Sequence, residues 1–256
     1  MSTPPDPWSR LAALTPARIA LGRSGASLPT REVLAFALAH AQARDAVHAP
    51  FDAEALAAEV AGQGLSPHIV DSAAPDRATY LRRPDLGRRL SAESRARLNE
   101  APCDIAVIIA DGLSSLAVQA HAPALLAVLA PAIRSAGWSL GPVVIARQGR
   151  VALADEVGER LRARLAILLV GERPGLSSPD SLGAYLTFAP AVGRTDAMRN
   201  CVSNIRTQGL SYEAAAFKIL WLVREALRLG LTGVSLKDQS DLVRVGGETQ
   251  AALNAS

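Results

Sequence analysis

Five consecutive apolar residues, 105–109 (IAVII), constrain the fold of this 256-residue chain more than any other feature. A strand with one face in water alternates apolar and polar residues, whereas a strand covered on both faces is apolar throughout. The run ends at Asp111 and Gly112, which are typical of a turn. The sequence therefore predicts a strand buried on both faces, as in a parallel sheet.

Similar segments follow along the chain. Strands are predicted at residues 143–146 and 165–170, with a possible last strand at 233–236. Helices are predicted at residues 113–129, broken near Pro123, and at residues 155–164 and 212–229. Strands that alternate with helices predict an α/β fold with a Rossmann-like, mainly parallel sheet and flanking helices.

The first hundred residues differ from the rest, because they contain helical patterns and loops but no comparable apolar run. Helical stretches are predicted after Thr30 and after Asp52, the second ending near Gly62. We therefore expect a helical N-terminal region at residues 1–100, followed by a Rossmann-like ligand-binding domain at residues 101–256.

Composition excludes several classes of protein. The 27 basic and 24 acidic residues leave a net charge of only +3, and no nucleic-acid-binding motif accompanies them, so no nucleic-acid partner is expected. No apolar run reaches the roughly 20 residues of a membrane span, and residues 1–11 do not resemble a secretory signal. A cytoplasmic protein without a membrane partner is predicted. Cys103 and Cys201 stand alone, which argues against a disulfide or a structural zinc site.

Seven arginines lie close together between Arg77 and Arg97. Their guanidinium groups could bind carboxylates or phosphates at a subunit interface. The same residues could equally form a solvated face, because Asp76, Asp85 and Glu93 lie among them. Both interpretations stay open.

Two loops follow predicted strands and could contact a ligand: residues 111–114 (DGLS) and 171–175 (GERPG). Neither reads GxGxxG, and no GxxxxGK[ST] occurs, so the loops could also be plain turns. The four histidines form no metal-binding or catalytic motif, and no serine lies in a GxSxG elbow. No catalytic residue and no metal ligand is therefore assigned, and the residues alone favour a ligand-binding module.

Six ordered segments together resemble one family. They are GRSG with PTR at residues 22–31, YLRRPDLGRRL at 80–90, DGLS at 111–114, RV at 150–151, VGERPGL at 170–176 and CVSNI at 201–205. In these segments the chain is similar to the small subunit of ethanolamine ammonia-lyase, an adenosylcobalamin-dependent enzyme. The resemblance extends from about Arg18 to Gly233.

The resemblance implies a hetero-oligomer in which a barrel-shaped large subunit holds ethanolamine and the small subunit completes the cobalamin site. The complex would convert ethanolamine to acetaldehyde and ammonia by a radical mechanism, and this chain alone would be inactive. Residues 101–256 would then be the cobalamin-binding domain. The family's cofactor contacts fall on Val151, Glu172 and Cys201, and the adjacent Arg150, Arg173 and Asn204 are second choices.

Two further points follow from the resemblance. Some members carry a longer polar N-terminal extension that is linked to packaging in a bacterial microcompartment; here only about 17 residues precede the first shared segment, which puts such packaging in doubt. The alternatives to the lyase interpretation are an independent Rossmann-like module that binds a nucleotide or metabolite, and a structural subunit whose arginine cluster is its working surface.

Overall fold

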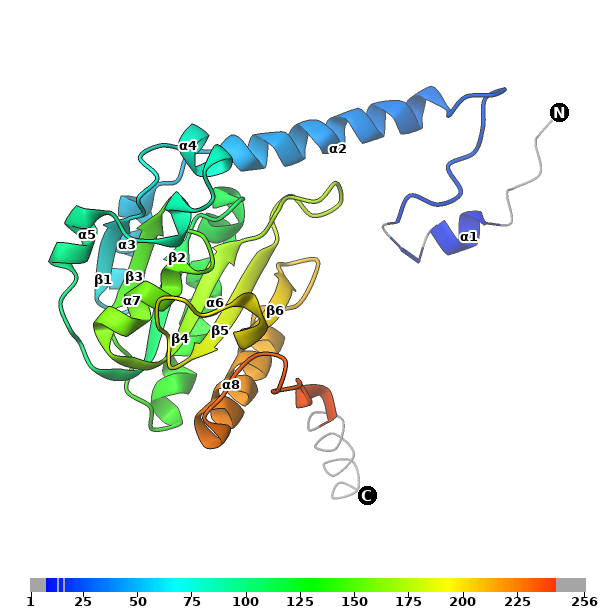
Figure 1. The fold of residues 1–256 in the computed structure, drawn as a ribbon. Helices are drawn as coiled ribbons and strands as arrows, with labels where there is room; N and C mark the ends of the chain where they lie inside the picture. The colour runs from blue at the N-terminus through cyan, green and yellow to red at the C-terminus, as the bar shows by residue number, and fades with distance from the viewer. Residues whose placement is uncertain (1–7, 13, 16, 243–256) are drawn as a thin grey trace, which may run out of the picture.

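A six-stranded sheet with the strand order β1-β3-β2-β4-β5-β6 forms the centre of the molecule (Figure 1). The structure is a computed structural model and describes residues 8–12, 14–15 and 17–242. The strands are β1 (Pro67–Asp71), β2 (Cys103–Ala110), β3 (Val143–Arg147), β4 (Ala163–Gly171), β5 (Leu182–Phe188) and β6 (Asn200–Ile205). The helices are α1 (Ser9–Ala12), α2 (Thr30–His48), α3 (Ala53–Gly62), α4 (Arg77–Arg82), α5 (Ala92–Arg97), α6 (Ser115–Ser135), α7 (Leu153–Leu161) and α8 (Tyr212–Leu229), with short 3-10 turns at Leu86–Arg88 and Asp196–Met198.

The sheet is mixed. Strands β1, β3, β2 and β4 run parallel to one another, whereas β5 is antiparallel to β4 and β6 is antiparallel to β5. The predicted α/β class is confirmed, but the expected Rossmann-like, mainly parallel sheet is not. The difference arises because β5 and β6 were not predicted: Gly183 interrupts the first, and the second is a largely polar edge strand.

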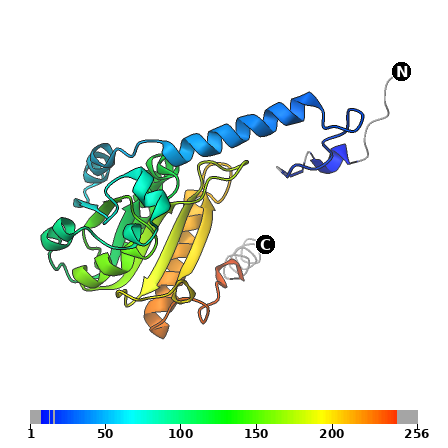
Figure 2. The same cartoon turned by 45° about the horizontal axis from the view of Figure 1, so that its top comes forward.

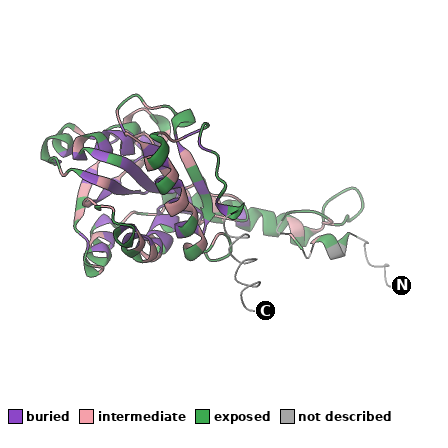
Figure 3. Cartoon of the chain, turned by 90° about the horizontal axis from the view of Figure 1, so that it is seen from below, coloured by how far each residue is buried: buried purple, intermediate pink, exposed green. Residues whose placement is uncertain are grey.

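Helices cover both faces of the sheet (Figure 2), which explains the uninterrupted apolar run in β2. Ile105, Val107 and Ile109 pack with α3, α6 and α8 in one core cluster. The alternate residues Ala106 and Ile108 pack with α7 in a second cluster on the other face. Because side chains alternate between the two faces of a strand, every position from Ile105 to Ala110 of β2 is buried and apolar. Buried segments accordingly concentrate in the sheet and its inner helix faces (Figure 3).

Helix α6 continues through both Pro123 and Pro131, so the predicted break is wrong. A proline inside a helix costs about 3 kcal/mol. Ten buried residues of α6, Leu125 and Leu129 among them, pack the helix on the sheet and offset that cost. By length and composition α6 could also cross a membrane, a property that buried core helices share.

Two expectations about the ends of the sheet change. Residues 1–100 contribute β1, which pairs with β3, so this region is not purely helical; the boundary at residue 100 stays a prediction. Residues 233–236 form a turn in place of a last strand, and Gly233 adopts a φ of +91°. The end of the predicted 101–256 domain, residues 243–256, lies outside the described residues.

A buried ion pair joins α7 to the antiparallel half of the sheet. Arg199 Nη2 donates to Asp155 Oδ2 at 2.7 Å, and Arg199 Nη1 donates to Thr187 Oγ1 at 3.0 Å. The side chains of Arg199 and Asp155 are only 3% and 2% exposed. Neither charge can therefore turn to water if its partner is removed.

We predict that Arg199→Met lowers the free energy of unfolding by about 3–5 kcal/mol, because it leaves the Asp155 carboxylate buried and unpaired. Urea unfolding followed by circular dichroism measures the change. The double variant Arg199→Met/Asp155→Leu serves as the control and should lose clearly less. An Arg199→Met protein as stable as the wild type would contradict the prediction.

Candidate functional site

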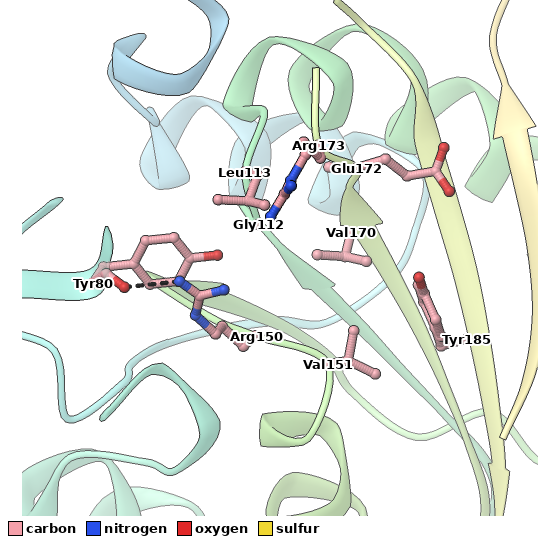
Figure 4. A pocket seen from close by; sticks show the side chains of 10 residues that line it. Tyr80, Gly112, Leu113, Arg150, Val151, Val170, Glu172, Arg173 and Tyr185 are labelled. Carbon is pink, nitrogen blue, oxygen red and sulfur yellow. Dashed lines mark hydrogen bonds between the residues drawn. The ribbon is translucent and has the colours of Figure 1, made fainter. Parts of the chain in front are cut away.

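A pocket of about 440 Å³ opens where β2, β3 and β4 end (Figure 4). It is lined by Tyr80, Gly112, Leu113, Arg150, Val151, Val170, Gly171, Glu172, Arg173 and Tyr185. The connection from β2 to β3 runs through α6 on one face of the sheet, and that from β3 to β4 runs through α7 on the other face. Such a change of face leaves a crevice at the carboxyl ends of parallel strands, where α/β proteins bind ligands.

Two glycines allow the loops after β2 and β4 to meet. Gly112 has a φ of +58°, and a Cβ added there would lie 2.3 Å from the carbonyl oxygen of Gly171. A Cβ on Gly171 would lie 2.0 Å from the carbonyl oxygen of Ser114. The Leu113 N–H also donates to the Gly171 oxygen at 2.9 Å. Backbone atoms cannot move aside as side chains can, so this pocket wall requires glycine at both positions.

Arg150 forms the opposite wall and is held by Tyr80. Its Nη2 donates to the Tyr80 carbonyl oxygen at 2.9 Å, the dashed line of Figure 4. Its guanidinium carbon lies 4.4 Å from the centre of the Tyr80 ring, a cation–π contact. Arg150 Nε is buried and has no hydrogen-bond partner among the described residues. A buried, unpaired guanidinium donor suits a position that meets a ligand.

Glu172 begins the loop after β4, and its carboxylate is fixed by two donors. Ser181 Oγ donates to Glu172 Oε2 at 2.5 Å, and the Asn204 N–H donates to the same oxygen at 3.3 Å. A Cβ on Gly183 would approach Oε1 to 2.9 Å, so this glycine makes room for the carboxylate. Asn204 itself has a φ of +58°, which turns its backbone toward Glu172.

Cys201 lies on β6, directly opposite Tyr185 of β5 in the strand register. The residue is exposed, but partial burial of its thiol raises the pKa, so the sulfur is neutral at pH 7. Burial likewise raises the pKa of Tyr185. Cys201 and Asn204 line a neighbouring pocket together with Lys218.

The structure therefore brings four of the six predicted contacts into one pocket: Val151, Glu172, Arg150 and Arg173. The other two line the neighbouring pocket, where Cys201 pairs in register with the lining residue Tyr185 and the Asn204 N–H donates to Glu172. Sequence reasoning missed Tyr80 and Tyr185 as lining residues. Tyr80 belongs to the segment that resembles the family, whereas no sequence signal distinguished Tyr185.

Asp111, at the end of β2, lies under the loops that form the pocket. Its side chain is buried, accepts a hydrogen bond from the Gly149 N–H at 3.0 Å and contacts Arg77 Nη1 at 3.3 Å. Burial raises the pKa of Asp111 to about 6, and Arg77 and the neighbouring N–H groups oppose that shift. Arg77 Nη1 also donates to the Gly112 carbonyl oxygen at 2.8 Å, so this pair supports the pocket loop.

The arginine cluster between Arg77 and Arg97 does not form one uniform surface. Arg77 is half-buried against Asp111, and Arg95 pairs with Glu156 at 2.5 Å. Arg83 pairs with the neighbouring Asp85 at 2.8 Å. Within the described part of the chain, no group of three histidine, cysteine, aspartate or glutamate side chains could hold a metal ion.

Fold and pocket together define an α/β protein with a candidate ligand site at the carboxyl ends of its parallel strands. Comparison with known proteins identifies the family: the chain belongs to the ethanolamine ammonia-lyase light chain family, whose model matches residues 5–237. The chain is 57% identical to the ethanolamine ammonia-lyase small subunit of Azotobacter vinelandii, over 94% of this chain and 92% of the relative. The small subunits of Ralstonia nicotianae (93% and 90% covered) and Xanthomonas campestris (97% and 94%) are also 57% identical. The chain is thus a component of an ammonia-lyase.

The buried Asp111 predicts a specific pH dependence of stability. Its pKa is about 6 in the folded state and near 3.8 in the unfolded chain, so between these values the folded state binds more protons. The free energy of unfolding should therefore fall by about 3 kcal/mol from this group as pH rises from about 3 to about 7, with about 2 kcal/mol of that loss between pH 4 and pH 6, and should level off above about pH 7. Asp111→Asn should remove that contribution while keeping an acceptor for Gly149.

Urea unfolding of the wild type and of Asp111→Asn at pH 4, 5, 6 and 7 measures this contribution. The difference between the two proteins isolates Asp111 from the other carboxylates. A difference that stays constant from pH 4 to pH 6 would show that Asp111 titrates normally.

Proposed function

We propose that this chain is the small subunit of an ethanolamine ammonia-lyase and completes an adenosylcobalamin site against a barrel-shaped large subunit. The observation that carries the proposal is the convergence of Arg150, Val151, Glu172 and Arg173 in one pocket. These residues come from two segments about twenty residues apart in the sequence, which the pairing of the strands brings to the same edge of the sheet. The parallel strands β1, β3, β2 and β4 would hold the cofactor at their carboxyl edge.

The chemistry of the pocket fits such a cofactor, which presents a flat, largely apolar ring fringed by amide side chains. Val151 and Val170 provide apolar contact surface, and Glu172 accepts hydrogen bonds of the kind that amides donate. Arg150 offers a buried unpaired donor for a carbonyl or phosphate oxygen. Gly112 and Gly171 let the loops after β2 and β4 meet and form one wall of the pocket.

The residues of this chain would bind and orient the cofactor and keep water from it. Ser181 and Asn204 hold the Glu172 carboxylate in place, and Tyr80 holds Arg150. When bound, the cofactor supplies the radical chemistry that converts ethanolamine to acetaldehyde and ammonia. No acid, base or nucleophile of this chain is assigned a part in that reaction, so ethanolamine would be held mainly by the large subunit. A cytoplasmic hetero-oligomer without nucleic-acid or membrane partners belongs to the same proposal, with microcompartment packaging doubtful.

Activity in the assembled complex tests the proposal. The chain and its cognate large subunit are purified separately and together, adenosylcobalamin is added, and acetaldehyde and ammonia are measured with ethanolamine as substrate. Turnover is expected only when both chains are present. A complete mixture without turnover would overturn the proposal, and tight binding of a nucleotide by the isolated chain would favour the independent module.

Substitution of Glu172 tests the pocket itself. Glu172→Ala should raise the concentration of adenosylcobalamin needed for half-maximal activity about 10- to 100-fold, because a hydrogen bond to a charged group contributes about 1.5–3 kcal/mol. The KM for ethanolamine should stay unchanged. Glu59→Ala, an exposed glutamate on α3, is the matched control. Equal losses for cofactor and ethanolamine would count against the role of Glu172.

A further inference from the structure

Helix α2 is a long helix that hardly touches its own domain. Of its 19 residues only Ala39 and Ala46 are buried. Figure 1 shows it extending past the sheet, and Figure 3 shows it exposed along most of its length. Several large apolar side chains on it face water, including Leu34 at 64% and Leu38 at 60% exposure. A contiguous exposed apolar surface on a helix is typical of an interaction site.

The exposed apolar residues lie on one side of α2. We call them the α2 stripe: Val33, Leu34, Ala37 and Leu38. At 100° per residue these positions share one face, because they recur at i, i+1, i+4 and i+5. Ala39 and Ala46 lie on the opposite face. The stripe therefore points away from the domain that carries the helix.

The described N-terminal segment does not account for the stripe. Its Arg18 guanidinium lies 4.9 Å from the centre of the Phe36 ring. Phe36 lies on the flank of the helix, outside the stripe, and is itself still exposed. The four stripe residues are exposed in spite of that contact.

The C-terminal end of α2 is hydrogen-bonded to residues that also hold the loops of the candidate pocket. Arg77 Nε donates to the Val47 carbonyl oxygen at 2.8 Å, while Nη1 of the same guanidinium donates to Gly112 in the pocket wall. Ser115, which begins α6 behind the pocket loop, donates through Oγ to the Ala49 carbonyl oxygen at 2.7 Å. The direction of α2 is thus set by the loop that lines the pocket, and both lie on the same edge of the sheet (Figure 2).

We propose that the α2 stripe is a docking surface for the large subunit, which would receive it in an apolar groove. This inference rests on the proposed function. The relatives are named small subunits, which implies a larger partner chain. That partner has to approach the carboxyl edge of the sheet to close the pocket, and the stripe continues from this edge. A helix laid in an apolar groove is a common recognition mode, with anchors at the spacing found here.

The double variant Leu34→Glu/Leu38→Glu tests the stripe. Two charges would have to be buried on docking, so the affinity for the cognate large subunit should fall at least 10-fold in titrations followed by analytical ultracentrifugation. Because both side chains are exposed, the melting temperature of the isolated chain should not change. With the large subunit in saturating excess, kcat should recover, as expected for a docking residue outside the reaction site.

The matched control is Ala35→Glu/Val234→Glu, which adds the same charge. Ala35 is exposed on another side of α2, and Val234, 76% exposed, is bonded through its backbone N–H to Ala197 in the β5–β6 connection, far from the pocket. This variant should bind the large subunit as the wild type does.

The outcomes separate the two proposals. If the wild type assembles and turns over ethanolamine but the stripe variant binds equally well, the stripe proposal is wrong and the proposed function stands. If the stripe variant loses only self-association of the isolated chain, the stripe binds a second copy and the proposal is also wrong. If the wild type neither assembles with the large subunit nor turns over ethanolamine, the stripe proposal and the proposed function are both overturned. If both proposals hold, Glu172→Ala should bind the large subunit as the wild type does.

Discussion

The contact between Asp111 and Arg77 is the interaction on which the rest of the site depends. A carboxylate buried at the end of a strand is costly unless donors surround it. Here one donor comes from the loop after β3, and the arginine comes from α4. The same arginine binds the loop after β2 and the end of α2. One buried charge pair thereby sets the pocket wall and the course of a helix that leaves the domain.

The centre of the fold could be predicted from sequence because there local pattern and tertiary environment agree. Residues 105–109 are apolar because both faces of β2 are covered, and the periodicity of residues 212–229 matches α8. The edges could not be predicted. β1 has one buried residue, Val70, β5 contains Gly183, and β6 is largely polar, so their pairing depends on neighbours distant in sequence. In α6, burial on the sheet outweighs the two prolines that locally oppose a helix.

The candidate site, like the fold, could be predicted from the sequence only in part. Turn chemistry alone indicated the loops at residues 111–114 and 171–175, because glycine after a buried strand is visible in sequence. The individual contacts came from the family resemblance, and the structure gathers most of them around those loops. Neither turn chemistry nor the family resemblance indicated Tyr185, because its position beside the pocket follows from the antiparallel pairing of β5 with β4 and β6. Strand register is a property of the assembled sheet.

The close approach of Gly112 and Gly171 has a consequence for how sequences with this site can diverge. Each position excludes a side chain because of the other loop's backbone, so no single replacement at either one can be absorbed by trimming a neighbouring side chain. The backbone of the opposite loop blocks a side chain at these two positions, a limit that does not apply to pocket positions that already carry one. Substitutions in related proteins could therefore change the ligand specificity of the pocket far more readily than its position in the fold.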